Sequence, residues 1–388
     1  MRASQRMQAI QEPVIPVIRE LIRTHPGTLS LGQGVSFFGP PPRSLERARA
    51  FGQAPDDHKY TPVQGLAPLL ELITRKLEAE NRVSLGAGRQ VIVTAGGNMA
   101  FLNALFAITD PGDEVILPLP FYFNQEMALG MLNCRAVPVP TDGNYQLDLA
   151  RIAGAITERT RAVVTISPNN PTGAVYPEDQ LRQINRLCKE RGIYHISDEA
   201  YENFVFDGAC AFSPASIPGS EDHTISLYSL SKAYGFASWR IGYMVIPSQL
   251  FASVLKAQDT NLICPPAVSQ HAAMGALEAG SAYCQEQLAT LRRVRGIVLE
   301  ELRGLEGLCD IPPAKGAFYV LLRINLPLDS MTLAERLICE HQVAVIPGIA
   351  FGVRNPCLLR ISYGALTEET AREGTRRLVK GLQSILAR

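Results

Sequence analysis

The chain has 388 residues, of which 46% are hydrophobic and 19% are charged, with 37 basic and 37 acidic side chains. This balance supports a large buried core and excludes an intrinsically disordered chain. The equal numbers of basic and acidic residues argue against nucleic-acid binding through a basic surface.

Two further classes are disfavoured by the residue pattern. No run approaches the roughly 20 apolar residues of a membrane-spanning helix, and the N-terminus has no apolar signal segment. The eight cysteines are scattered, without a CxxC pair, which fits neither a zinc site nor a disulfide framework. We therefore expect a soluble cytoplasmic protein with reduced thiols, no metal, no nucleic-acid partner and no membrane contact.

Strand-length apolar runs alternate with helical segments between about residues 90 and 285. The expected strands are 90–94, 114–118, 161–167, 193–197, 224–230 and 241–246. The expected helices between them are 98–108, 123–133 and 177–192. Such alternation is typical of a mostly parallel sheet covered by helices on both faces, so the fold class predicted is α/β.

The C-terminal third has a different pattern. A long charged helical segment from 281 to about 305 is followed by shorter strands and helices, and a C-terminal helix begins near Thr367 with a threonine cap. We predict a large domain over residues 45–285 and a smaller α+β domain built from residues 1–44 with 286–388.

Nucleotide-binding motifs are weak in this chain. Gly32 and Gly34 begin a G-x-G sequence, but Phe37 stands where the third glycine belongs, and no βαβ pattern precedes it. The chain has no G-x-x-x-x-G-K-[ST] sequence. Dinucleotide-binding and P-loop functions are therefore disfavoured.

Lys232 follows an apolar strand in the sequence Ser229-Leu230-Ser231-Lys232. A lysine enclosed by apolar strands loses its proton more readily, which suits Schiff-base chemistry. The hydroxyls of Ser229 and Ser231, with Arg240, are suited to holding a phosphate. A surface lysine on a loop between strands fits the same local residues equally well.

Polar side chains also follow other expected strands. Asp198 and Tyr201 lie in SDEAY, and Asn170 lies in SPNNPTG. Sheets of this class bind ligands at the carboxyl ends of their strands, although a helix cap and a turn explain Asp198 and Asn170 equally well. Gly97 and Asn98 lie at a strand–helix junction, where free backbone N–H groups can bind phosphate.

In chain order these segments resemble the fold-type I PLP-dependent aminotransferases of class I/II, of the aspartate, aromatic and kynurenine aminotransferase kind. The resemblance covers nearly the whole chain. The matching segments are LGQG (31–34), HKYTPVQGL (58–66), TAGGNMA (94–100), SPNNPTG (167–173), SDEAY (197–201), SLSKAYGFASWRIGY (229–243), KGAFYVLL (315–322) and LLRISYG (358–364). This family's fold implies a mostly parallel seven-stranded sheet flanked by helices, with a smaller α+β domain.

The resemblance implies catalytic roles for three residues. Lys232 would bind pyridoxal 5'-phosphate (PLP) as a Schiff base and then move the proton between the substrate Cα and cofactor C4′. Asp198 would pair with the pyridine nitrogen, so that the ring accepts electrons. Tyr201, together with Asn170, would hydrogen-bond O3′ of the cofactor.

The resemblance also implies a phosphate site that involves two subunits. The groups expected around the phosphate are Ser229, Ser231, Arg240, the backbone at Gly97 and Asn98, and Tyr60 of the neighbouring subunit. A homodimer is therefore expected, because one chain alone would lack the tyrosine contact.

The substrate contacts implied are fewer. Arg360 would grip the α-carboxylate with its planar guanidinium, near Asn170 and the backbone of Gly34. Tyr122 would stack on the cofactor ring, with a core residue at a helix start as the alternative. Phe37 would line the substrate pocket or fasten the N-terminal arm to the core, and the sequence leaves both open.

The function implied is transfer of an amino group from an L-amino acid to a 2-oxo acid, by a ping-pong mechanism through pyridoxamine phosphate. A large neutral or aromatic donor is preferred. No motif-anchored arginine marks a second carboxylate, but arginine is common in the chain, so dicarboxylate substrates stay open.

Two alternatives come from different classes of protein. Another fold-type I PLP enzyme, such as a C–S lyase, a decarboxylase or a PLP-dependent oxidase of a biosynthetic pathway, shares the same motifs. A ligand-sensing module of a transcription regulator is disfavoured, because the chain is neutral and shows no helix-turn-helix pattern before the cofactor segments.

Overall fold

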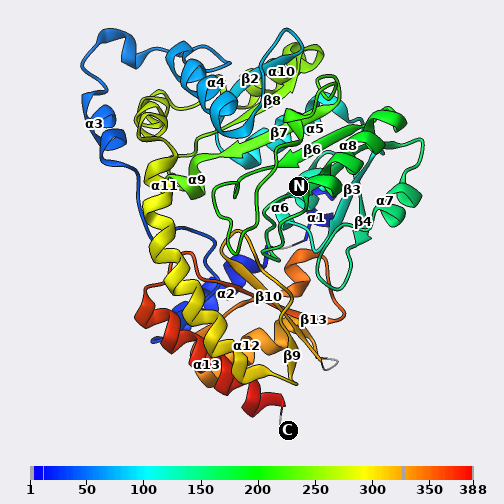
Figure 1. The fold of residues 1–388 in the computed structure, drawn as a ribbon, viewed down its shortest axis with the longest axis vertical. Helices are drawn as coiled ribbons and strands as arrows, with labels where there is room; N and C mark the ends of the chain where they lie inside the picture. The colour runs from blue at the N-terminus through cyan, green and yellow to red at the C-terminus, as the bar shows by residue number, and fades with distance from the viewer. Residues whose placement is uncertain (1–3, 12, 326–327, 387–388) are drawn as a thin grey trace.

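The computed structural model describes residues 4–11, 13–325 and 328–386. A seven-stranded sheet of order β2-β8-β7-β6-β5-β3-β4 forms the centre of the larger part of the molecule (Figure 1). Its strands are β2 (Arg89–Thr94), β3 (Glu114–Leu119), β4 (Arg135–Pro140), β5 (Thr160–Ile166), β6 (Tyr194–Asp198), β7 (Thr224–Ser229) and β8 (Gly242–Pro247). β8 runs antiparallel to both of its neighbours, and the other pairs are parallel. The predicted mostly parallel sheet is confirmed.

Successive side chains of a strand point to opposite faces of the sheet. In this sheet the side chains on both faces are buried. On β3, Val115 and Leu117 join one apolar cluster, whereas Ile116 joins another. The first cluster is completed by α5, α6 and α10, and the second by α7 and α8. The helices of this part are α4 (Ala67–Asn81), α5 (Gly97–Ile108), α6 (Phe123–Met131), α7 (Leu149–Ala155), α8 (Glu178–Arg191), α9 (Leu230–Ala233) and α10 (Phe251–Leu262).

The sequence analysis missed one strand of the sheet, β4. β4 carries two prolines, Pro138 and Pro140, which cannot donate ladder hydrogen bonds and lower the strand signal. β4 lies at the edge of the sheet, paired only with β3, where missing donors are tolerated.

The smaller part contains a four-stranded antiparallel sheet of order β12-β13-β10-β9. Its strands are β9 (Cys309–Asp310), β10 (Tyr319–Ile324), β12 (Ile346–Pro347) and β13 (Cys357–Ser362), and its helices are α12 (Ser330–His341) and α13 (Glu368–Leu386). Thr367 accepts a hydrogen bond from Thr370 N at 3.2 Å, which supplies the predicted threonine cap of α13.

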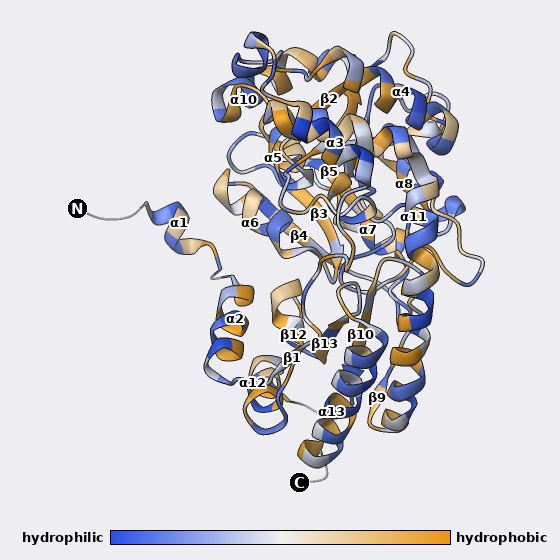
Figure 2. Ribbon diagram, turned by 90° about the vertical axis from the view of Figure 1, so that its left-hand side faces the viewer, coloured by the Kyte–Doolittle hydropathy of each residue, from blue (hydrophilic) through white to orange (hydrophobic). Residues whose placement is uncertain are grey.

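The N-terminal arm divides between the two parts. β1 (Leu29–Ser30) pairs in parallel with β11 (Val343–Ala344), and α2 (Val14–Thr24) packs on α12. In contrast, α1 (Gln5–Ala9) contacts α6, away from the C-terminal elements (Figure 2). The arm therefore connects both parts of the molecule.

A single long helix, α11 (Ala267–Leu302), runs from the larger part to the smaller one (Figure 1). It is kinked at Gly280, whose φ is 68° and ψ −170°, so its second half begins where the long helical pattern was predicted. α3 (Pro42–Ala50) packs along α11. Because α11 crosses residue 285, the domain boundary proposed there lies inside a helix and stays a prediction. No helix in the described parts of the chain is long and apolar enough to cross a membrane.

Candidate active site

A cavity of about 770 Å³ opens at the carboxyl ends of β2, β5, β6 and β7. These ends share one edge because β8, the reversed strand, lies between β2 and β7. The predicted site residues that line this cavity are Gly34, Gly97, Asn98, Tyr122, Asn170, Asp198, Tyr201, Ser229, Ser231, Lys232, Arg240 and Arg360. Segments separated by more than 300 residues thus meet in one place.

Lys232 is presented by α9, a single helical turn directly after β7. Ser229 caps this turn by accepting a hydrogen bond from Ser231 N at 3.2 Å. The Lys232 amine donates to the carbonyl oxygen of Gly34 at 2.5 Å. Burial, followed by the positive charges of Arg360 and Arg240, lowers the pKa of Lys232 to about 8. The amine is therefore available unprotonated far below the usual pH range of lysine.

Asp198 ends β6 and is fixed by two donors. Its Oδ1 accepts from the backbone of Ala200 at 3.2 Å, and its Oδ2 accepts from Gln125 Nε2 at 3.1 Å. Burial raises the pKa of Asp198 to about 6, while the two hydrogen bonds and the charge of Lys232 oppose that shift. At neutral pH the carboxylate is mostly ionised and held in one orientation.

Arg360 lies on β13, 3% exposed, and reaches across from the smaller sheet. Its Nη1 donates to Asn170 Oδ1 at 2.9 Å, and its Nη2 donates to the carbonyl of Gly32 at 2.8 Å. Its guanidinium stacks 4.5 Å from the Tyr319 ring centroid and 5.1 Å from that of Phe351. No described carboxylate pairs with it, and its buried Nε has no acceptor, a costly state that an anionic ligand would relieve.

The residues predicted to bind the phosphate lie close together. Arg240 has a left-handed backbone, with φ 54°, and its Nη1 donates to the carbonyl of Ala237 at 2.8 Å. The same nitrogen lies 3.5 Å from Ser231 Oγ. Gly96, the cap residue of α5, has φ 82°, and a Cβ there would collide with Arg240 Nη2. The N-terminal turn of α5 therefore approaches the guanidinium in a way that only glycine permits.

Three tyrosines complete the wall of the cavity. The hydroxyls of Tyr201 and Tyr319 lie 2.7 Å apart. Tyr122 accepts from Asn124 Nδ2 at 2.7 Å and donates to Asn98 Oδ1 at 3.5 Å. Burial raises the pKa of Tyr122 to about 12, so this phenol stays neutral. Its ring lines the cavity, as the stacking prediction requires, and that role stays a prediction.

Two predicted site residues lie outside this cavity. Tyr60 is 80% exposed, a position compatible with a role in a neighbouring subunit, which one chain does not test. Phe37 packs edge-to-face on Phe38, with ring centroids 5.2 Å apart, and Phe38 packs against the main core. Phe37 is absent from the cavity lining within one chain, and its role stays a prediction.

Three sets of residues at the site were missed by the sequence analysis. Gln125 follows the predicted Tyr122 by three residues, so a helix that begins there brings both to the same side. Tyr319 lies in KGAFYVLL, a segment that the analysis singled out without assigning this residue a role. The third set lines the cavity from α2 and consists of Ile15, Ile18, Arg19 and Ile22; its helical spacing was the available signal.

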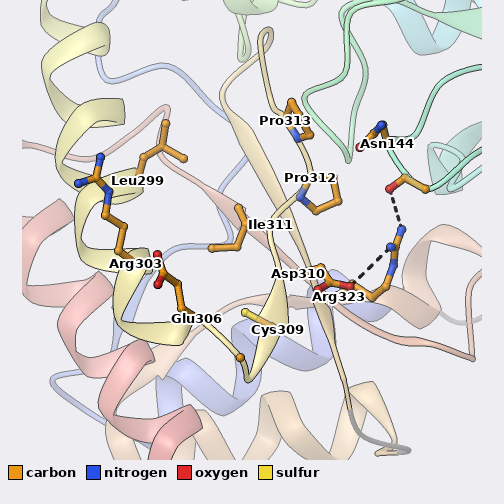
Figure 3. A pocket seen from close by; sticks show the side chains of 12 residues that line it. Asn144, Leu299, Arg303, Glu306, Cys309, Asp310, Ile311, Pro312, Pro313 and Arg323 are labelled. Carbon is orange, nitrogen blue, oxygen red and sulfur yellow. Dashed lines mark hydrogen bonds and ion pairs between the residues drawn. The ribbon is translucent and has the colours of Figure 1, made fainter.

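A second cavity of about 600 Å³ lies where the 143–144 loop meets the smaller part (Figure 3). Arg323 Nη2 donates to the carbonyl oxygen of Gly143 at 3.1 Å, and Arg323 Nη1 lies 3.8 Å from Asp310 Oδ2 (Figure 3). None of the predicted site residues lines this second cavity. Among the residues that the structure describes, no group of three or more His, Cys, Asp or Glu side chains is placed to hold a metal.

Comparisons with known proteins agree with this geometry. The family model described as aminotransferase class I and II matches residues 26–378. An aromatic aminotransferase of Arabidopsis thaliana is 36% identical, with 99% of this chain and 97% of that protein covered. A probable aspartate/prephenate aminotransferase of Aquifex aeolicus is 38% identical over 84% of each chain.

Solved structures give the same result for the fold. The aspartate aminotransferase of Thermus thermophilus, solved with maleate, superimposes with a TM-score of 0.90 at 33% identity and covers 98% of this chain and 100% of its own. The structures of this group share the fold-type I architecture described above. The chain is a member of the class I and II aminotransferase family, and it is a transaminase.

Proposed function

We propose that the cavity binds PLP and that the protein moves amino groups between amino acids and 2-oxo acids in two alternating half-reactions. The observation that supports this proposal most strongly is the grouping of Lys232, Asp198 and Arg240 in one cavity. The pKa values of Lys232 and Asp198, and the contact of Arg240 with Ser231, are those that a lysine-bound pyridine ring with a phosphate needs.

The residues present fit this cofactor. The phosphate would be held by Arg240, Ser231 and the N-terminus of α5. Gly96 has no side chain, so the backbone at the start of α5 lies close to the Arg240 guanidinium. Asp198, ionised and oriented by Gln125, would face the ring nitrogen. When bound, PLP supplies a ring that accepts electrons from the substrate Cα and holds the amino group between half-reactions.

The chain's own residues perform the remaining tasks. Arg360 binds and orients the substrate α-carboxylate, because it is a buried guanidinium without a carboxylate partner among the described residues. Lys232, once released from the cofactor, takes the proton from the substrate Cα, a role suited to an amine with its pKa near 8. Tyr201, held by Tyr319, and the amide of Asn170 would orient the ring hydroxyl.

The donor proposed is a large neutral or aromatic amino acid. The side of the cavity formed by α2 presents Ile15, Ile18 and Ile22, and Phe123 and Ile346 add further apolar surface. Apolar walls of this kind favour apolar side chains. The names of two relatives mention aromatic, aspartate and prephenate substrates. These names are consistent with an aromatic donor, but they do not identify the donor of this protein.

A homodimer is proposed as the active form. Tyr60 is 80% exposed although it is a large aromatic residue, and a partner subunit would cover it. The phosphate of each site would then receive one contact from the neighbouring chain.

The half-reaction tests this function. Purified holoenzyme is mixed with a single amino acid and no oxo acid, and the products are counted against enzyme sites. The proposal predicts one oxo acid per site, no free ammonia, and recovery of the original absorbance when a 2-oxo acid is added. Continuous release of ammonia, sulfide or carbon dioxide, or uptake of oxygen, would instead assign the lyase, decarboxylase or oxidase alternatives.

A further inference from the structure

Arg19, on α2, differs from every other cation of the active-site cavity. The cavity is lined by Arg19, Lys232, Arg240 and Arg360, and by Asp198 as the single carboxylate. Lys232, Arg240 and Arg360 each donate hydrogen bonds to protein groups. Arg19 lines the cavity, is exposed, and has no hydrogen bond or ion pair within the described chain.

Helical spacing explains why Arg19 faces the cavity. Ile15, Ile18, Arg19 and Ile22 follow the 3, 4 and 7 spacing of one helix face, and all four line the cavity. α2 lies beside the smaller sheet, beneath the seven-stranded sheet (Figure 1), and packs on α12 and β12. The arginine is therefore presented by an anchored helix, within a row of isoleucines.

The charges of the cavity leave this arginine without an assigned partner. Under the proposed function, Arg240 faces the cofactor phosphate, Arg360 faces the substrate α-carboxylate, and Lys232 holds the cofactor itself. These groups account for the cofactor and for the α-carboxylate that every amino-acid substrate shares. A fourth cation is unneeded for an apolar donor, and a substrate with one more anionic group would pair with it.

We propose that Arg19 binds the distal carboxylate of a dicarboxylic substrate, so that the α2 face serves both substrate classes. An apolar donor packs its side chain on Ile15, Ile18 and Ile22. A dicarboxylic 2-oxo acid, as acceptor, lays its methylenes on the same isoleucines and places its second carboxylate on Arg19. This inference rests on the proposed function and names its acceptor class.

Binding of non-reacting acids to the holoenzyme tests the assignment. Succinate has two carboxylates and butyrate one, both with four carbons and no amino or oxo group, and titration calorimetry gives Kd for each. In Arg19→Ala we expect Kd for succinate to rise about tenfold or more, as for loss of a charged hydrogen-bond pair, with butyrate unchanged. Arg19→Lys should restore part of the succinate affinity.

A matched control lies on the same helix. Arg23→Ala removes an exposed arginine that is paired with Glu20 at the surface and is absent from the cavity lining, so it should leave both Kd values unchanged. An equal change for succinate and butyrate in Arg19→Ala, or no change for succinate, would overturn the inference. So would a wild-type enzyme that binds succinate no more tightly than butyrate.

Kinetics separate this inference from the proposed function. Arg19→Ala should raise the KM for 2-oxoglutarate while the half-reaction with an apolar donor keeps its rate and KM. If the wild-type enzyme forms no oxo acid from any amino acid, the proposed function fails, whatever the succinate titration shows. If that half-reaction is normal and the KM for 2-oxoglutarate is unaffected, only the role of Arg19 fails.

Discussion

A buried guanidinium without a carboxylate partner is expensive, and Arg360 is one: it is 3% exposed, and its described partners are an amide oxygen, a carbonyl and two aromatic rings. A protein keeps such a group where a ligand supplies the missing anion. In the role proposed for Arg360, the substrate carboxylate would meet a charge that folding has already desolvated, which makes the interaction stronger than at a solvated surface.

Replacing Arg360 tests that reasoning. We expect Arg360→Gln to raise KM for every donor and acceptor, because all of them share the α-carboxylate. A loss of about 2–5 kcal/mol, typical of a truncated buried charge pair, corresponds to about 30-fold or more in KM. Steady-state kinetics with one apolar and one acidic substrate measures the change; an effect confined to one of the two would contradict the assignment.

The pKa of Lys232 gives a second prediction. Only the unprotonated amine attacks the aldehyde of PLP, so the rate at which cofactor-free protein takes up PLP should rise with pH. Its midpoint should lie near 8, the pKa to which burial and the charges of Arg360 and Arg240 lower this lysine. Stopped-flow absorbance from about pH 6 to 10 measures it.

The same experiment separates the causes of the shift. Arg360→Gln should move the midpoint upward, because a positive charge that disfavours the protonated amine is removed. Arg354→Gln, a control at an exposed arginine outside the cavity lining, should leave the midpoint in place. A midpoint near the value of free lysine in the wild-type protein would show that Lys232 is solvated rather than enclosed.

At the residue scale the sequence predicted the groups that carry chemistry and missed those that position them. Lys232, Asp198 and Arg360 lie in recognisable segments, and the structure brings all three to one cavity. Gln125 and Arg19 have ordinary side chains in ordinary helical patterns. Only tertiary packing shows that Gln125 reaches Asp198 and that Arg19 faces the cavity.

The turn after β6 contains a second buried acid, Glu199, which is 3% exposed. Its carboxyl accepts from Ser213 Oγ at 3.0 Å, and Ser213 in turn lies 2.9 Å from Tyr228 Oη. Burial, followed by the nearby charge of Glu202, raises the pKa of Glu199 to about 8, against the opposing effects of the serine hydroxyls and Lys76. The folded protein therefore keeps a proton that the unfolded chain releases.

This difference makes stability depend on pH in a defined direction. Because the folded pKa is raised, the contribution of Glu199 is complete below about 4.5 and is lost as the pH rises through about 8. Glu199→Gln, which is neutral at all pH values, should therefore gain stability relative to wild type as the pH increases across that window. Urea unfolding at about pH 5, 7 and 9 measures the difference.

A control and a contrary outcome belong to this test. Glu335→Gln, exposed on α12, should show a pH-independent difference from wild type. If Glu199→Gln loses stability relative to wild type as the pH rises, the carboxyl is ionised in the folded protein, and the account of this turn is wrong.

At the element scale, apolar runs located most strands but not their direction or their edges. The residue pattern of β8 is as apolar as that of its neighbours, because β8 is equally buried. A period-two pattern does not indicate the direction of a strand, so the antiparallel orientation of β8 could not be predicted. β4 was missed because Pro138 and Pro140 weaken a strand signal that an edge position tolerates. The long helix α11 was predicted only beyond Gly280, since the first half is apolar enough to be buried all round.

At the scale of the whole molecule, the order of the motifs predicted the fold and the gathering of the site. The site is built from both sheets, with Arg360 from the small one and Lys232 from the large one, so movement between them would change the distance that a substrate spans. The division of the N-terminal arm was not predictable, because α1 and α2 are both short and only their contacts show which part of the molecule each one joins.

Assembly is the prediction that belongs to this scale. Sedimentation at micromolar concentration should give twice the mass of one chain for wild type. In Tyr60→Phe the dimer should persist while PLP binds more weakly, because the variant keeps the ring and loses only the hydroxyl proposed to reach the phosphate. A monomer with full activity would contradict the proposed arrangement.

The most direct test of the central claim is the chemical location of the cofactor. Borohydride fixes an aldehyde bound to a lysine as a stable secondary amine, so reduced holoenzyme can be digested and its peptides weighed by mass spectrometry. The account predicts one phosphopyridoxyl group per chain, on Lys232, and none in Lys232→Ala, which should still fold. A label on another lysine, or a wild-type protein that takes up no PLP, would contradict it.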